Sequence, residues 1–263
     1  MSITRKFQEI QLSRRSPRAT EQANSFHKSK KEVPQPALKL VDNSLKKARK
    51  VELKPKSLNQ EAYIELLTDP SKVIVFATGP AGTGKTLLAV MAAIKAYQEG
   101  TCKKIIISRP AVTIDDEQHG FLPGDLTAKM EPWAIPIMDV FAEYYKQTEI
   151  EGMLEDKIIE LAPIGYLRGR SLKDAWIILD EAQNASKVQM KAILTRIGQN
   201  SKMVVTGDLG QIDTKYSHEN GMTDFTDRLA KTNSKIIATI QFSRKDIQRS
   251  AAVAEVLSIY GED

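Results

Sequence analysis

Residues 79–86 read GPAGTGKT and follow directly on the apolar run VIVFAT at 73–78. The spacing is G-x-x-x-x-G-K-[ST], in which glycines let the backbone fold around a phosphate so that successive N–H groups point at it. Such a loop needs a strand before it and a helix after it. The β-branched run supplies the strand, and the helix-forming stretch TLLAVMAAIKAYQEG supplies the helix. The stretch therefore predicts a P-loop that binds a nucleoside triphosphate, because a chance match would lack this context.

Within this loop, two side chains have defined chemical tasks. Lys85 is expected to reach the β- and γ-phosphates, and the hydroxyl of Thr86 is expected to hold Mg²⁺. The backbone that surrounds the phosphates is expected to come from Gly79, Pro80, Ala81, Gly82, Thr83 and Gly84.

Five strand-like runs alternate with helical segments along the chain. The runs are VIVFAT (73–78), KIIIS (104–108), WIILD (176–180), MVVTG (203–207) and IIATIQF (236–242). The helical segments are 85–99, 128–146, 186–198, 221–231 and 244–259. This alternation predicts an α/β fold with a five-stranded parallel sheet and helices on both faces. Ligands of such sheets bind at the carboxyl ends of the strands, so the polar motifs that follow the strands are expected to converge there.

The run at 176–180 ends in Asp180, and Glu181 comes next. Four apolar residues before an acid are typical of a Walker B strand, whose Asp belongs to the Mg²⁺ shell. A Glu directly after that Asp could orient and deprotonate a water for attack on the γ-phosphate, which favours an ATPase over a kinase. The alternative interpretation is a buried strand that meets a solvated acidic turn.

Two glutamines are further candidates. Gln211, in GDLGQID after the run at 203–207, could hydrogen-bond the γ-phosphate or the attacking water, since this strand is expected beside the P-loop strand. Gln60, in LNQEAYIELL, lies at the start of a predicted helix, where its amide could pair with the adenine edge. A helix-capping role for Gln60 explains its position equally well.

A long connection, 111–175, separates the second and third strand runs, and connections of this length are usually functional. Trp133 and Phe121, beside Lys129 and Arg168, could form an aromatic and cationic surface on which single-stranded nucleic acid stacks. However, Trp133, Ile137 and Phe141 are spaced four apart, and we expect them to be the buried face of a helix, with RNA contact left to the loop before them. The acidic triplet at 115–117 is expected to be a solvated turn.

Charge is divided unevenly along the chain. Residues 1–56, the basic arm, carry 15 Lys+Arg and 5 Asp+Glu, whereas the whole chain has a net charge of only +5. Few aromatics and no sustained period predict a largely flexible arm that either contacts polyanions such as RNA or only aids solubility. The sequence contains no run of 18 or more apolar residues, so it predicts no membrane-spanning helix. The single cysteine, Cys102, cannot form a disulfide within the chain, which is consistent with a reducing cytoplasm.

From about residue 58 to 259 the chain resembles the PhoH-like ATPases, a family similar to the superfamily 1 helicase core. The matching segments are NQEAYIELL, GPAGTGKT, SRPAV, GFLPGDL, APIGYLRGRSLKDAWIILDEAQN, MKAILTRIG and SKMVVTGDLGQID. The resemblance implies a RecA-like core that binds and hydrolyses ATP with Mg²⁺. It implies Gln60 at adenine, Lys85 and Thr86 at the phosphates, Asp180 and Glu181 at Mg²⁺ and water, and Gln211 as sensor. It also points to Arg249, although Ser250 stands where the family usually has His.

Superfamily 1 helicases close two such domains around one nucleotide, whereas this sequence shows one P-loop and one set of strands. An arginine supplied by a neighbouring subunit would complete the site, so a homo-oligomeric ring, with a hexamer favoured, is the expected assembly. Arg249 is the first candidate for this arginine, and Arg168 and Arg170 are the second, although sheet-edge or RNA-facing roles suit these two equally well. The expected function is ATP hydrolysis coupled to binding or remodelling of single-stranded RNA. A regulatory or scaffold ATPase is the alternative, and a ribonuclease partner is a third.

Overall fold

The computed structural model describes residues 49–110, 126–212, 220–248 and 251–260. This part of the chain contains a six-stranded sheet in the order β3-β2-β4-β5-β1-β6. The strands are β1 (Ile74–Thr78), β2 (Lys104–Ser108), β3 (Ile159–Leu161), β4 (Ala175–Leu179), β5 (Lys202–Gly207) and β6 (Ile237–Gln241). All neighbouring strands run parallel. The fold is therefore the predicted RecA-like P-loop core, with the P-loop strand β1 between β5 and β6.

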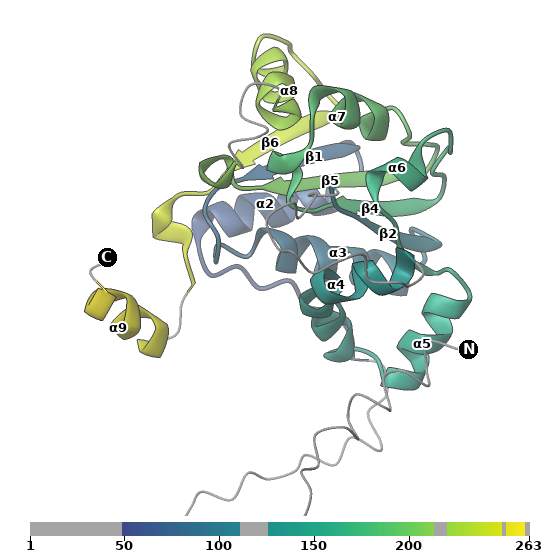
Figure 1. The fold of residues 1–263 in the computed structure, drawn as a ribbon, viewed down its shortest axis with the longest axis horizontal. Helices are drawn as coiled ribbons and strands as arrows, with labels where there is room; N and C mark the ends of the chain where they lie inside the picture. The colour runs from purple at the N-terminus through teal and green to yellow at the C-terminus, as the bar shows by residue number, and fades with distance from the viewer. Residues whose placement is uncertain (1–48, 111–125, 213–219, 249–250, 261–263) are drawn as a thin grey trace, which may run out of the picture. The chain divides into compact units, whose positions relative to one another are not determined.

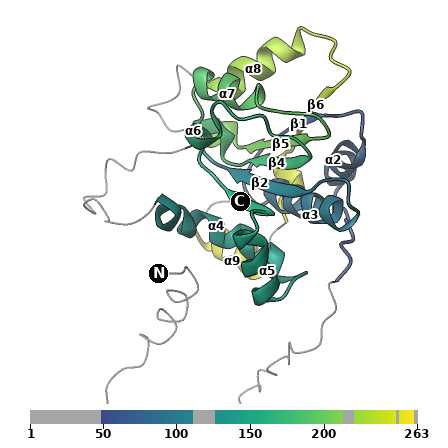
Figure 2. The same ribbon diagram turned by 90° about the vertical axis from the view of Figure 1, so that its right-hand side faces the viewer.

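Helices cover both faces of the sheet (Figures 1 and 2). One face carries α2 (Leu58–Thr68), α3 (Lys85–Gln98), α4 (Leu126–Ala142) and α5 (Gln147–Glu155). The other carries α6 (Ile164–Leu167), α7 (Lys187–Leu194) and α8 (Gly221–Ala230). Short 3₁₀ turns follow three strands: η1 (Ala182–Asn184), η2 (Leu209–Gln211) and η4 (Arg244–Asp246). A last helix, α9, spans Ala251–Tyr260.

Alternation along each strand divides the core into two apolar clusters. Val75, Ile107 and Ile178 face the α2–α3 side, whereas Phe76, Ile106 and Ile177 face the α7–α8 side. Every residue of β4 is buried, as a central parallel strand with both faces covered requires. This packing brings the carboxyl ends of β1, β4 and β5 side by side, with β5 next to the P-loop strand as the sequence predicts.

The structure corrects the strand count and the content of the long connection. A sixth strand, β3, pairs with β2 at the edge of the sheet. The sequence gives no clear sign of it because its three residues, IEL, are too few to show a period. The connection 111–175 also holds α5 and α6 besides the predicted helix, observed as α4. As predicted, Ile137 and Phe141 are buried, and Trp133 packs against the same cluster.

The predicted helix 244–259 is confirmed only in its second part, which is observed as α9. The chain makes only the turn η4, and α9 starts at Ala251, because the Asp246 carboxylate is bonded to Ser243 and to Asn59 of α2. Within residues 49–56, assigned to the basic arm by composition, Val51 is 2% exposed and Leu53 packs against the same apolar cluster, whereas the other six residues are exposed. The rest of the arm, 1–48, lies outside the described residues. In the described part, each helix is too short or too polar to span a bilayer.

Candidate functional site

The P-loop follows β1 and is shaped by two glycines that no other residue could replace easily. Gly79 has φ 138°, and a Cβ there would lie 2.5 Å from the carbonyl oxygen of Phe242. Gly84 has φ 84° and precedes α3, with the Gln60 amide 3.1 Å from where its Cβ would be. The loop therefore passes closely between β6 and α2 before it enters the helix whose N-terminus favours anions.

Lys85 is the first residue of α3, and its side chain turns back into the loop. Its Nζ donates to the carbonyl oxygens of Gly79 and Pro80, each at 2.7 Å. Burial lowers the pKa of Lys85, while the carboxylates of Asp208, Glu181 and Asp180 oppose this shift. The ammonium thus lies among P-loop carbonyls and three acids.

Asp180 follows β4 and accepts two hydroxyl hydrogen bonds on one oxygen. Thr86 Oγ1 donates to Asp180 Oδ1 at 2.7 Å, and Thr206 Oγ1 donates to the same atom at 2.6 Å. A carboxylate and a threonine hydroxyl in contact are hard oxygen donors of the kind that Mg²⁺ takes together with nucleotide phosphates. These two predicted metal residues, Thr86 and Asp180, therefore fit the ion.

Glu181 adopts an uncommon backbone conformation, with φ 53° and ψ 37°, in the left-handed region. Its Oε2 accepts a hydrogen bond of 2.6 Å from the side-chain amide of Gln183. The sequence prediction did not include Gln183; the one signal was an amide two residues after the candidate base.

Gln211 ends the turn η2 after β5 and is exposed in the wall of a cleft that Lys85 and Asp180 also line. Its N–H donates to the carbonyl of Asp208, so this turn is closed on the residue that directly follows β5. The predicted sensor and the P-loop thus border one cleft.

Gln60 is buried, with 4% of its surface exposed, and its amide joins two backbone segments. Oε1 accepts from Lys56 N at 2.8 Å, and Nε2 donates to Thr83 O at 3.0 Å. Ser57, and not Gln60, caps α2. Gln60 therefore fixes the P-loop to the chain before α2, and its role at adenine stays a prediction.

A second contact holds the P-loop from the β6 side. Gln248 N donates to Gly82 O at 2.9 Å. The turn before it is fastened to α2, since Asp246 Oδ2 accepts from Asn59 Nδ2 and Ser243 N, each at 2.8 Å. Burial alone would raise the pKa of Asp246, but hydrogen bonds from Ser243, Asn59 and Ser57 outweigh it and lower the pKa to about 2.

Of the predicted arginines and the residues of the long connection, only some lie in the described part of the chain. Arg249, Phe121 and the triplet at 115–117 lie outside the described residues. Arg170 pairs with Glu160 of β3 through both guanidinium nitrogens, one of them at 2.8 Å, which suits a sheet-edge role, and Arg168 is exposed.

These groups border the carboxyl-end cleft, a cavity of about 650 Å³ whose walls include Gly82, Lys85, Thr86, Asp180, Glu181 and Gln211. Its size suits a small-molecule ligand. The convergence of a P-loop, an acidic pair and an amide is the arrangement that binds a nucleoside triphosphate and activates water beside it.

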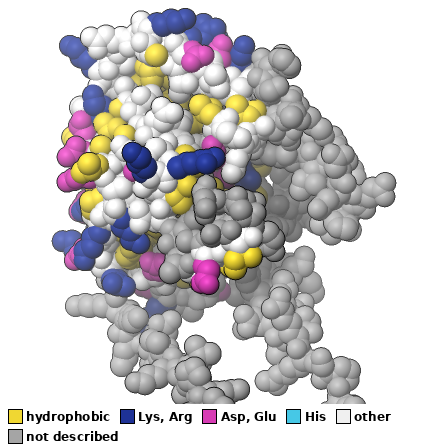
Figure 3. Space-filling view, turned by 90° about the vertical axis from the view of Figure 1, so that its left-hand side faces the viewer, with side chains coloured by type: hydrophobic (Ala, Val, Ile, Leu, Met, Phe, Trp, Pro, Cys, Tyr) yellow, Lys and Arg dark blue, Asp and Glu magenta, His cyan; other side chains and the backbone are white. Residues whose placement is uncertain are grey.

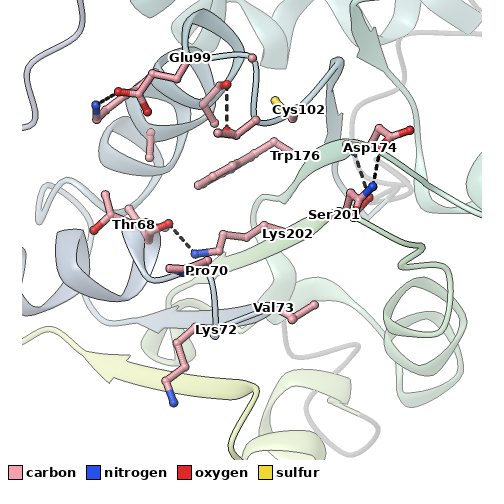
Figure 4. Close-up of a pocket in the computed structure, with 18 of the residues that line it drawn as sticks. Thr68, Pro70, Lys72, Val73, Glu99, Cys102, Asp174, Trp176, Ser201 and Lys202 are labelled. Carbon is pink, nitrogen blue, oxygen red and sulfur yellow. Dashed lines mark hydrogen bonds and ion pairs between the residues drawn. The ribbon is translucent and has the colours of Figure 1, made fainter.

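A larger cavity of about 1010 Å³, the amino-end cleft, lies at the opposite ends of the strands. Figure 4 shows Trp176 between Cys102 and Lys202 there. Lys202 Nζ lies 5.5 Å from the centre of the Trp176 ring. Burial lowers the pKa of Lys202 to about 8 and raises that of the Cys102 thiol to about 11. No predicted site residue lies in this cleft.

The sequence is similar to a known protein family and to several of its bacterial members. The family model described as "PhoH-like protein" matches residues 52–261. The PhoH-like protein of Bacillus subtilis is 40% identical over 215 residues, 82% of this chain and 66% of that protein. The PhoH-like protein of Mycobacterium tuberculosis H37Rv is 41% identical over 79% of this chain and 58% of its own length. Protein PhoH of Escherichia coli K12 is 36% identical over 72% and 53%. The chain thus spans about half to two thirds of the length of these relatives.

Two solved structures are more distant. The Sulfolobus solfataricus SWI2/SNF2 ATPase core in complex with dsDNA has a TM-score of 0.42 at 13% identity, over 78% of this chain and 49% of that one. The Pyrococcus furiosus Hef helicase domain has a TM-score of 0.41 at 14% identity, over 70% and 38%. At these scores neither supports the fold, which rests on the strand order.

Proposed function

The chain belongs to the PhoH-like protein family and has a P-loop ATPase core, and from that premise we propose that it hydrolyses ATP with Mg²⁺ and couples hydrolysis to single-stranded RNA. One observation carries the first part of the proposal. The hydroxyls of Thr86 and Thr206 converge on one oxygen of Asp180, in the cleft that also contains Lys85 and Glu181. P-loop enzymes hydrolyse nucleotides with this combination of groups.

Each residue has a role that follows from its chemistry. Lys85 would exchange its contacts with the Gly79 and Pro80 carbonyls for phosphate oxygens, for which an ammonium is the better partner. Glu181 would accept a proton from the attacking water, and Gln211 would orient that water. Thr86 and Asp180 would hold Mg²⁺, which neutralises charge on the phosphates.

The test of hydrolysis is phosphate release from ATP in the presence of Mg²⁺. The parental protein should turn ATP over, and Lys85→Ala should abolish turnover and weaken ATP binding, because a phosphate-holding cation is lost. Lys95→Ala is the matched control, since Lys95 lies on the same helix and its ammonium pairs with Glu99. Equal turnover of the parental protein and Lys85→Ala would contradict the proposal.

The RNA part of the proposal is supported by the charge of the basic arm. The face in Figure 3 carries basic and acidic side chains side by side, and this mixture gives no uniform field for a polyanion. Poly(U) should therefore stimulate ATP turnover of the full chain, and deletion of residues 1–48 should lower RNA affinity and flatten its salt dependence while leaving basal turnover intact. If deletion of the arm left the salt dependence of RNA affinity unchanged, the arm would not be an RNA contact. If poly(U) did not stimulate ATP turnover, a regulatory or scaffold ATPase in the cytoplasm would be favoured.

We also propose a homo-oligomeric ring in which Arg249 of one subunit reaches the nucleotide of the next. Arg249→Ala should then reduce turnover and keep ATP binding, by up to the ~10³–10⁵-fold typical of such arginines. Mixing it with Lys85→Ala should restore activity, because some interfaces then join an intact P-loop to an intact Arg249. If mixed oligomers form and stay inactive, Arg249 acts within its own subunit or is structural.

A further inference from the structure

Gln183 lies on η1, two residues after the candidate base, and is buried with 1% of its surface exposed. Both ends of its side-chain amide are bonded. Nε2 donates to Glu181 Oε2 at 2.6 Å, and Oε1 accepts from the backbone N–H of Asp208 at 3.1 Å. The amide therefore joins Glu181, the second residue after β4, to Asp208, the first residue after β5.

The orientation of this amide is determined by chemistry. The Asp208 N–H can only donate, so the amide oxygen must face it, which leaves the NH₂ group to face Glu181. The main chain of Gln183 is held as well, because Asn220 Nδ2 donates to its carbonyl. A Cβ at Gly207 would lie 2.8 Å from Gln183 Oε1, so the amide fills the space available.

Glu181 is the group that needs such support. Its left-handed backbone, with φ 53°, is a costly conformation for a residue other than glycine and persists only when the surrounding structure holds it. The Asp208 end of the link matters too, since the carbonyl of Asp208 accepts from Gln211 N at 2.9 Å. Gln183 thus connects the proposed base to the turn that bears the proposed sensor.

We propose that Gln183 is a positioning residue that holds the Glu181 carboxylate at a fixed place relative to Gln211 by bonding Glu181 and the Asp208 backbone at once. This inference rests on the proposed ATP hydrolysis and adds the residue that orients the water-activating group. It predicts that loss of the donated hydrogen bond changes turnover and leaves ATP binding largely as it is.

Gln183→Glu is the sharpest substitution, because it keeps the shape and the acceptor for Asp208 N–H but replaces the donor to Glu181 by a second carboxylate. We expect kcat to fall about 100-fold, the size of effect that a misplacement of about 1 Å produces, and the Kd for ATP to change less than about threefold. Gln189→Glu is the matched control. It makes the same change in the first turn of α7, where Gln189 Oε1 accepts from Ser186 N and a glutamate serves equally well.

A double variant tests the contact without any need for activity. Glu181→Gln combined with Gln183→Glu reverses donor and acceptor, so a Gln at 181 can donate to a Glu at 183. The Tm should fall in Gln183→Glu, where two carboxylates face each other, and return toward the parental value in the double variant, although turnover stays lost because the base is missing. A Tm that does not recover would overturn the contact.

The outcomes for turnover separate this inference from the proposed function. If Glu181→Gln stalls hydrolysis but Gln183→Glu turns ATP over at the rate of Gln189→Glu, hydrolysis stands and the positioning role of Gln183 is wrong. If Gln183→Glu loses ATP affinity in the same proportion as kcat, Gln183 supports the whole cleft and the positioning role is again wrong. A parental protein without ATP turnover would overturn both.

Discussion

The carboxyl-end and amino-end clefts differ in what their polar side chains contact. At the carboxyl end, Lys85 of α3 and the two acids after β4, Asp180 and Glu181, converge on one space. At the amino end, Lys202 Nζ also donates to carbonyls, those of Leu66, Leu67 and Asp69, but Asp174 of this cleft is bonded to Asn200 and not to Lys202. The amino-end cleft is the larger, at about 1010 Å³ against about 650 Å³. Volume alone would therefore select the amino end of the sheet, whereas the convergence of polar groups favours the carboxyl end.

The amino-end cleft is organised to hold the sheet and helices together. Ser201 Oγ donates to Leu172 O at 2.8 Å, and Asn200 Nδ2 donates to Asp174 Oδ1 at 3.0 Å. Substitutions at this end should change stability, whereas substitutions at the carboxyl end should change binding or turnover of ATP. The predictions below can break this division.

Among the substitutions discussed below, the largest effect is expected for Glu181→Gln. Only the proton acceptor is removed, so kcat should fall about 10²–10⁴-fold while ATP remains bound. Single-turnover phosphate release and equilibrium binding of ATP measure the two quantities separately. Hydrolysis at the parental rate would mean that another group activates the water.

A smaller effect, on binding instead of turnover, is expected for Asp246→Asn. Asp246 fastens the turn η4 to Asn59, and Gln248 just after this turn bonds the P-loop at Gly82. Weakening hydrogen bonds to a charged group costs about 1.5 kcal/mol, so the Kd for ATP should rise about tenfold with kcat little changed at saturation. Asp227→Asn, on the exposed side of α8, is the control and should leave the Kd unchanged. A fall in kcat without a change in Kd would assign Asp246 to the chemistry.

The same carboxylate predicts a stability effect in acid. Its pKa is about 2 in the folded protein and near 3.8 in the unfolded chain, so the unfolded chain binds its proton first as the pH falls. The stability that Asp246 contributes is therefore fully present above about pH 4 and is lost toward pH 2. Urea unfolding at pH 5, 4 and 3 should show a steeper loss for the parental protein than for Asp246→Asn. Parallel pH profiles would contradict the low pKa.

Local signals explain which parts of the site the sequence predicts. The P-loop, the acidic pair after β4 and four of the five predicted helices are encoded within short windows, where spacing and side-chain type suffice. Gln183 and Asp246 depend on partners elsewhere in the chain. Asp208 is 25 residues from Gln183, and Asn59 is 187 residues from Asp246. Nothing near either residue in the sequence reveals such a partner. The apolar content of 244–259 therefore predicts one helix, whereas the contacts of Asp246 hold the first part as the turn η4.

The smallest effect on ATP is expected at the amino end, for Lys202→Met. The substitution keeps the aliphatic length over Trp176 but removes the ammonium that bonds the last carbonyls of α2, so stability should change while ATP turnover at pH 7.5 stays within about twofold of the parental value. The pH dependence identifies the ammonium itself. Burial lowers the pKa of Lys202 to about 8, with only Asp69 opposing, whereas the unfolded value is 10.5.

Between these two pH values the unfolded chain keeps a proton that the folded protein has released, so the contribution of Lys202 to stability rises with pH from about 8 to 10.5. The free energy of unfolding of the parental protein, relative to that of Lys202→Met, should therefore rise between pH 8 and pH 10. A constant difference would mean that the three carbonyls hold the ammonium charged throughout. The division between the two clefts would also fail if Lys202→Met weakened ATP binding. Helix α2 contains both Gln60, which bonds the P-loop, and carbonyls that Lys202 bonds. A rigid α2 would then transmit the change from the amino-end cleft to the carboxyl-end cleft.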